Sequence, residues 1–516
     1  MMSIKSNKRC LDAFVILILI VFGISSILFL DVFPEVWMDE AWVSTTAYTF
    51  QKDGTLRNLT LESASRGNQD VHFLAPSILS NIFIAPIFSL LGVGSVQGRL
   101  ASVFMGALAV IGFYFLSRKI GGIVFSSFCT IIFIFDNLFF VITRTIRPEI
   151  YVVTIAIWVL LLILNVGTSF WKLFFCGVLL GISLYTHPNS VLVLIAVFII
   201  VMSQVKFQQY GKVLFPLILG VVIGFLPYAF YLIYQDGANY FNDFWLQIHD
   251  RAEMLINPKT FFSVAVTAEL ERYSSYIFFP YRLPIFLIQI IAVGYAIYKK
   301  ADKVNQTLLI FIFVHVVLFP ILISSKTSRY LTVLMPAVTI LVIKMVWDIA
   351  GWSYTITLPT ILSSITKLNR NLLISAVLVL TLIINQTGGD VWAILKSRDC
   401  SFPPFISQVR DLVPSGAKVW GPMTFWFGFY DHPYRTQMTV NNEEEMNIFK
   451  PQYVILYDTE IWGNQTGVTK RLDPYYEQME VVRNLLTHLV LTKGELMGSV
   501  PNSCYGNIEI YKLIWE

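Results

Sequence analysis

The sequence predicts an α-helical multi-pass membrane protein with a small α/β domain at its C-terminal end. Of its 516 residues, 56% are hydrophobic and only 14% are charged, and the mean hydropathy is +0.66. A soluble protein carries about 25% charged residues. The apolar residues also gather in runs that approach the roughly 20 residues needed to cross a bilayer as a helix. These two observations exclude a soluble globular protein.

The first apolar run, Leu11–Leu30, follows a basic head that contains Lys5, Lys8 and Arg9. It is too long for the core of a signal peptide and no small-residue cleavage site follows it, so we expect an uncleaved first span. Further apolar runs lie at Phe73–Leu91, Leu100–Leu116, Gly122–Ile142, Ile150–Leu164, Leu173–Tyr185, Val191–Met202, Val213–Tyr234, Leu283–Tyr298, Leu308–Ile323, Tyr330–Trp347 and Leu372–Ile384.

Positive charge decides which runs cross, because short cytoplasmic loops are rich in Lys and Arg. The run Phe73–Leu91 contains Pro76 and Pro86, and proline bends a helix. If residues 72–92 lie along the membrane interface, all the basic loop clusters fall on the cytoplasmic side. We therefore expect about 11 transmembrane helices in a cell membrane, with the N-terminus cytoplasmic and the C-terminus extracytoplasmic. The basic loop clusters that this topology places in the cytoplasm are Arg118 with Lys119, Lys206 with Lys212, and Lys299, Lys300 and Lys303.

The region after the last run differs in character. Residues 388–516 contain strand-like pieces at Tyr453–Tyr457 and Ile508–Ile514 and a helical pattern at Tyr476–Leu489. About 130 residues suffice for a small domain. We expect a transmembrane domain over residues 1–387, including an outer loop at 31–71, and a soluble extracytoplasmic domain over 388–516.

Cysteine and charge patterns limit the cofactors and partners. The five cysteines have unrelated spacings, which excludes a zinc finger. We assign no metal ligands and leave a divalent cation open as a cofactor. Cys400 and Cys504 both lie in the expected outer domain, where an oxidising compartment favours a disulfide; two buried free thiols are the alternative. The formal net charge of +4 is spread over many loops, so we expect no nucleic-acid partner.

Two adjacent acids, Asp39 and Glu40, follow the first span and are flanked by Trp37 and Trp42. Tryptophan favours the membrane interface, so these carboxylates would lie at the height of a lipid phosphate. A carboxylate in that place can act as a general base. The alternative is that both acids cap the helix that follows, since acids suit a helix N-terminus.

A second candidate group is Arg144, Arg147 and Glu149, at the outer end of a span. Two arginines on that side run against the positive-inside rule, and charges that defy the expected pattern are functional candidates. The alternative is ordinary: Pro148 begins a helix that Glu149 caps, and the arginines contact solvent or lipid headgroups.

A third group is Lys326, Arg329 and Tyr330, in an outer loop rich in hydroxyl groups. A lysine and an arginine three residues apart form a candidate phosphate clamp, with Arg as a planar fork and Lys as a point charge. Snorkelling of cations at helix ends is the alternative. His72 and His187 complete the set of candidate substrate-binding residues, although a lone histidine is more often structural.

In their order and spacing, these motifs resemble those of the GT-C-type integral membrane glycosyltransferases, in the branch that includes protein O-mannosyltransferases and aminoarabinose transferases. The likeness extends over about Val36–Pro336. It matches the acidic pair at Asp39, the segment opened by His72, the Arg-rich turn at Glu149 and the Arg329–Tyr330–Leu331 stretch. Two departures are visible: His72 is not followed by a pair of prolines, and Glu149 stands where Asp is usual.

The resemblance implies transfer of a sugar from a polyprenyl-phosphate donor to a lipid, glycan or protein acceptor on the extracytoplasmic face. Asp39 would be the general base, with Glu40 and Glu149 orienting a substrate. Lys326 and Arg329 would stabilise the departing lipid phosphate. The rival hypothesis is a transporter or flippase of lipid-linked sugars without catalysis.

Overall fold

A computed structural model describes residues 2–60, 78–164, 167–256, 266–278, 282–300, 302–323, 327–351, 370–436, 440, 442–457 and 474–515. These residues form two compact units. The helical unit comprises Met1–Ser26, Val103–Thr143 and Pro148–Trp392, and the mixed unit comprises Ile27–Ser102, Arg144–Arg147 and Ala393–Glu516. The mixed unit therefore contains residues from both sides of the boundary predicted between residues 387 and 388.

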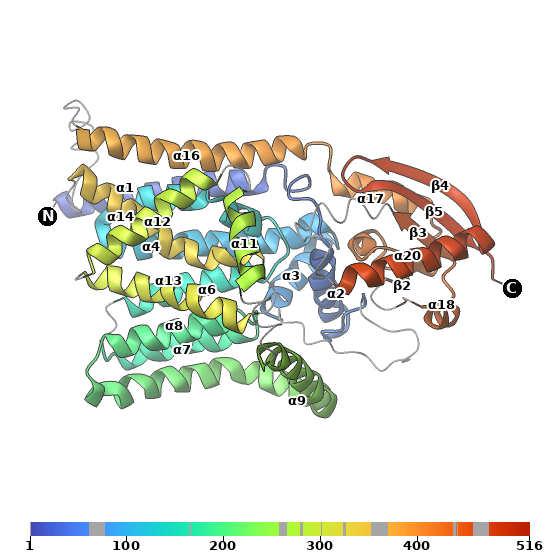
Figure 1. The fold of residues 1–516 in the computed structure, drawn as a ribbon, viewed down its shortest axis with the longest axis horizontal. Helices are drawn as coiled ribbons and strands as arrows, with labels where there is room; N and C mark the ends of the chain where they lie inside the picture. The colour runs from blue at the N-terminus through green and yellow to red at the C-terminus, as the bar shows by residue number, and fades with distance from the viewer. Residues whose placement is uncertain are drawn as a thin grey trace. The chain divides into compact units, whose positions relative to one another are not determined.

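The helical unit consists of long apolar helices that run side by side (Figure 1). Within the described residues, 5 helical segments are long and apolar enough to cross a membrane: Ser95–Ile134, Phe207–Tyr231, Lys303–Leu322, Ser328–Ala350 and Leu373–Lys396. Shorter apolar helices accompany them. The helices of this unit are α1 (Met2–Ile27), α4 (Ser95–Ile134), α5 (Asn137–Thr143), α6 (Glu149–Ile163), α7 (Phe170–Leu184), α8 (Ser190–Ser203), α9 (Tyr210–Ile256), α11 (Ala268–Phe278), α12 (Leu283–Tyr298), α13 (Lys303–Leu322), η3 (Ser328–Leu334), α14 (Met335–Ala350) and α16 (Arg370–Lys396).

Helix α4 combines two of the runs that the sequence separates. Gly122 interrupts it with φ 76° and ψ −169°, a conformation that glycine adopts at little cost. The helix is kinked there, just after the polar residues Ser117, Arg118 and Lys119 that separate the two runs in the sequence.

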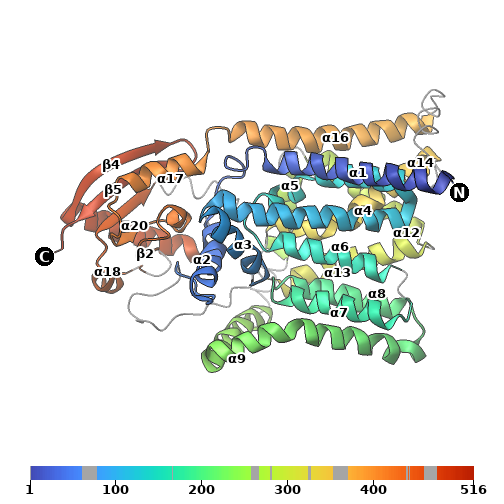
Figure 2. The same cartoon turned by 180° about the vertical axis from the view of Figure 1, so that it is seen from behind.

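Helices α7 and α9 pack through glycines spaced four residues apart (Figure 2). A Cβ atom built on Gly177 would lie 2.1 Å from the Leu217 carbonyl oxygen, and one on Gly181 would lie 2.3 Å from that of Val221. A Cβ atom built on Gly220 of α9 would lie 2.1 Å from the Phe174 carbonyl oxygen of α7. Such small-residue contacts let helix backbones approach in a membrane, where the hydrophobic effect does not hold helices together.

Replacing Gly181 by Leu should separate α7 from α9, because the side chain would meet backbone atoms that cannot rotate away. We expect a loss of about 1–3 kcal/mol, the usual cost of overpacking a core, measured as a lower thermal midpoint of the purified protein in detergent. Gly294→Leu in α12 is the matched control, because a Cβ there meets nothing within 4 Å. Equal midpoints for the two variants would contradict the close packing.

The mixed unit is built around a five-stranded sheet in the order β2-β1-β3-β5-β4. Strand β1 pairs in parallel with β2 and β3, whereas β5 pairs antiparallel with β3 and β4. Strands β3 and β5 coincide with the strand-like pieces of the sequence. The strands are β1 (Val419–Trp420), β2 (Tyr434–Arg435), β3 (Tyr453–Tyr457), β4 (Gly494–Asn502) and β5 (Gly506–Leu513).

Side chains alternate between the two faces of this sheet, and both faces are covered. Val419, Ile455 and Ile508 belong to a core shared with helices from the first hundred residues and with α17. Trp420 and Val454 belong to a second core on the other face, under α18 and α20. The helices of this unit are α2 (Met38–Asp53), α3 (Ile78–Leu91), α17 (Phe402–Asp411), α18 (Glu443–Phe449) and α20 (Pro474–Lys493).

Candidate active site

The acidic pair begins helix α2, but its two carboxylates have different environments. The Trp37 amide donates to Glu40 Oε1 at 3.1 Å, so Glu40 caps the helix, as the simpler interpretation of the pair proposed. Glu40 is fully buried. Arg99 donates to both of its oxygens, with Nε at 2.8 Å from Oε2 and Nη2 at 2.7 Å from Oε1. The Glu40 carboxylate is thus enclosed by donors from Trp37 and Arg99.

Asp39 is the accessible acid of the pair. Its side chain is 18% exposed and forms an ion pair with Arg147, which is 7% exposed. The N-terminus of α2 adds partial positive charge beside the carboxylate. Asp39 is therefore a carboxyl group held in place by a cation and open on one side, which is an arrangement that suits a general base.

The turn Arg144–Arg147 is held against the first loop by buried donors. Arg144 is fully buried, and its guanidinium donates to the carbonyl oxygens of Leu28 at 2.7 Å and Phe33 at 3.0 Å. The Ile146 amide donates to Glu40 Oε2 at 3.0 Å. Arg144 thus shapes the loop that precedes the acids, while Arg147 reaches Asp39 itself.

Arg99 is the residue of this group that sequence reasoning missed. It is the single charged residue in the first turns of α4, which belong to the mixed unit, and it also donates to the Leu30 carbonyl oxygen at 2.7 Å. An isolated charge within an apolar helix is itself a signal of function or of a buried partner, and this signal was present in the sequence.

In the helical unit, Glu149 and Arg329 come together. Glu149 begins α6 and is 2% exposed, and its Oε1 lies 3.6 Å from Nε of Arg329 in η3. The Arg329 side chain is 27% exposed. Along the chain, only Pro148 separates Glu149 from Arg147. Of the predicted site residues, His72 and Lys326 lie outside the described residues.

Tyr330 and His187 also lie together in the helical unit. Their ring centroids are 5.2 Å apart, and the Asn189 amide donates to His187 Nδ1 at 3.1 Å. The Nδ1 atom is therefore an acceptor, which leaves the proton of a neutral ring on Nε2. Tyr330 further contacts Phe319, with centroids 5.9 Å apart.

Sequence reasoning also missed Arg272 in α11, which lies over the ring of Phe319, the residue that contacts Tyr330. Cζ of Arg272 is 3.9 Å from the Phe319 ring centroid, and the arginine pairs with Glu269 one helical turn away. Arg272 is buried. Two arginines, one histidine and two aromatic rings thus gather around η3 in the helical unit.

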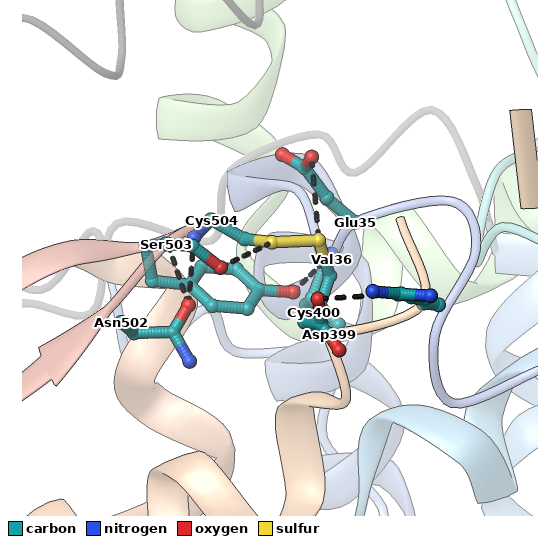
Figure 3. The surroundings of a disulfide bond; sticks show 9 residues. Glu35, Val36, Asp399, Cys400, Asn502, Ser503 and Cys504 are labelled. Atoms are coloured by element: carbon teal, nitrogen blue, oxygen red, sulfur yellow. Dashed lines mark hydrogen bonds and ion pairs between the residues drawn. A yellow bond between two sulfur atoms is a disulfide. The ribbon is translucent and has the colours of Figure 1, made fainter. Parts of the chain in front are cut away.

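Among the described residues, a single group of three side chains brings potential metal-ligating atoms within 4.8 Å of one another: Glu35, Cys400 and Cys504. Cys400 and Cys504 are joined in a disulfide (Figure 3). A metal is bound by thiolates, so in the oxidised protein only the Glu35 carboxylate of this group is an anionic ligand.

Comparisons with known proteins place this geometry in a known fold. The chain matches no family model, and no curated protein is similar to it in sequence. Solved structures are similar along almost all of it. The structure of ArnT from Cupriavidus metallidurans bound to undecaprenyl phosphate has a TM-score of 0.58 and 13% identity, and the match covers 97% of this chain and 98% of that one. The chain has a GT-C-type glycosyltransferase fold. The apo form of the same ArnT matches with a TM-score of 0.58.

The GT-C-type fold also appears in a larger archaeal protein. The oligosaccharyltransferase AglB from Archaeoglobus fulgidus, in complex with an inhibitory peptide and a dolichol-phosphate, has a TM-score of 0.53 and 10% identity, with 93% of this chain and 72% of that one covered. A structure of the same oligosaccharyltransferase holds zinc and sulfate and has a TM-score of 0.52. At these identities the likeness establishes the fold.

Proposed function

We propose that this chain transfers a sugar from a polyprenyl-phosphate donor to an acceptor at the extracytoplasmic face of a cell membrane. One observation carries the proposal: over 97% of its length the chain has the fold of a structure that holds undecaprenyl phosphate. The archaeal oligosaccharyltransferase with the same fold holds a dolichol-phosphate and a peptide. A lipid-linked donor and a separate acceptor are thus the substrates that suit this fold.

Asp39 is the general base in the proposed mechanism. It removes a proton from the acceptor hydroxyl as the acceptor oxygen bonds to the anomeric carbon. The bond from that carbon to the phosphate oxygen breaks at the same time, so the configuration at the anomeric carbon inverts. The partial exposure of Asp39 and its pairing with Arg147 support this role.

Arg329 and Lys326 stabilise the negative charge that grows on the departing lipid phosphate. The partial exposure of the Arg329 side chain supports this assignment, because Arg can donate two parallel hydrogen bonds to phosphate. Glu149 orients Arg329 through their ion pair. Tyr330 follows Arg329 in the chain and its ring contacts that of His187. These two residues are proposed to bind the donor, and His72 and Arg144 to support the acceptor side.

We further propose about 11 spans, a cytoplasmic N-terminus and an extracytoplasmic location for residues 388–516. The disulfide between Cys400 and Cys504 supports this sidedness, since disulfides persist in oxidising compartments.

Purified protein should release free polyprenyl phosphate from some members of a panel of polyprenyl-phosphate sugars, detected by chromatography of the lipid product. Where no acceptor hydroxyl is supplied, water receives the sugar. Each donor is tested with long and short carriers, with and without a divalent cation. We expect release from donors that share one sugar. Binding of donors without release from any of them would contradict catalysis and favour the transporter hypothesis.

A further inference from the structure

The backbone that leads into the acidic pair is held by a residue from the far end of the sequence. The Val36 amide donates to the Tyr505 hydroxyl oxygen at 2.9 Å, although 469 positions separate the two residues. Both are buried. Val36 is three residues before Asp39, so this bond fixes the chain at the point where it turns into α2.

Tyr505 is itself held on several sides. The Asn502 side-chain oxygen accepts from the amides of Cys504 at 2.8 Å and Tyr505 at 3.0 Å. The Tyr505 ring stacks on Phe405, with centroids 5.0 Å apart and planes 11° apart. Burial raises the pKa of the Tyr505 hydroxyl, which therefore stays neutral. The hydroxyl oxygen is thus a fixed acceptor for the Val36 amide.

The loop that leads into α2 is also attached at Asp31, by hydrogen bonds from Ser401 and Phe402. Ser401 Oγ donates to Asp31 Oδ2 at 2.6 Å, and the Phe402 amide donates to the Asp31 carbonyl oxygen at 3.2 Å. The disulfide between Cys400 and Cys504 joins these two attachments (Figure 3). We call residues 400–402 and 502–505 the brace. Figure 3 shows Glu35 and Val36 beside its disulfide.

We infer that Tyr505 is a positioning residue for sugar transfer: through the brace it holds the start of α2 so that Asp39 keeps its place beside Arg147. This inference rests on the proposed role of Asp39. Glu40 and Arg99 fix the chain after Asp39, and the brace fixes it before. Asp39 then moves only if one of these two attachments gives way.

Tyr505→Phe removes the hydroxyl and keeps the stacked ring. Because misplacing a catalytic group by about 1 Å can cost 10²-fold in rate, we expect kcat to fall at least about tenfold while KM for the donor stays unchanged. Tyr434→Phe is the matched control. Tyr434 is buried in the same core, and its hydroxyl also donates to a backbone oxygen, that of Pro422 at 2.6 Å, which lies far along the chain from the acidic pair.

The double variant Cys400→Ala/Cys504→Ala tests the same brace without touching Tyr505, and it keeps the test decisive if Tyr505→Phe folds poorly. It should lower kcat in the same way, and combining it with Tyr505→Phe should add little, because both act on one element. If the wild type is active and Tyr505→Phe matches Tyr434→Phe in kcat, the inference is wrong and the proposed function stands. An inactive wild type on every donor would instead count against the proposed function.

Discussion

Asp39→Asn should reduce the rate of sugar transfer by about 10²- to 10⁴-fold, the usual contribution of a general base, while leaving the fold and donor binding intact. Asparagine has the same shape as aspartate and still offers an oxygen to Arg147, but it cannot take a proton from the acceptor. The measurements are the initial rate of polyprenyl phosphate release from a donor that the wild type cleaves, and the affinity of both proteins for that donor.

Asp431→Asn is the matched control for this loss. Asp431 lies in the same unit and is 39% exposed, and its Oδ2 is 2.7 Å from Nη2 of Arg410. It lies far along the chain from the acidic pair. Its variant should transfer sugar at the wild-type rate. Normal transfer by Asp39→Asn would remove Asp39 from the mechanism, and a transporter would tolerate both substitutions equally.

Local features of the fold were predictable from the sequence because they depend on neighbouring residues. Strand β3 coincides with the apolar run Tyr453–Tyr457, and its alternate residues enter the two cores that cover the sheet. The order of the strands was not predictable, because it depends on which segments meet in three dimensions. Val36 and Tyr505 meet in the core on one face of the sheet, and no local pattern indicates such a contact.

The site shows the same division. The tryptophans around the acidic pair predict carboxylates at the membrane interface, but they do not indicate which of the two is accessible. Consecutive residues on a helix point about 100° apart, so one acid can be enclosed while its neighbour faces outward. Arg99 decides the matter by enclosing Glu40. A count of Lys and Arg in loops does not include Arg99, because this residue lies inside a helix.

Arg99→Leu should be the most destabilising substitution in the mixed unit, because it leaves the Glu40 carboxylate buried without a counter-charge. Removing one partner of a buried ion pair costs about 3–5 kcal/mol, and both side chains of this pair are 0% exposed. The checks are the unfolding midpoint in detergent and the yield of folded protein. Arg410→Leu is the control, since the Arg410–Asp431 pair is 36% and 39% exposed and such pairs contribute about 0–1 kcal/mol.

A second substitution separates the unpaired charge from the lost packing of the arginine side chain. In Arg99→Leu/Glu40→Gln the buried group is neutral, and the Gln oxygen still accepts a hydrogen bond from a backbone amide, that of Trp37 or Ile146. The double variant should therefore recover part of the stability that Arg99→Leu loses. If it is no more stable than the single variant, the cost comes from the space left by Arg99. The pair would then matter for its shape, and the charge on Glu40 would contribute little to holding Asp39 in place.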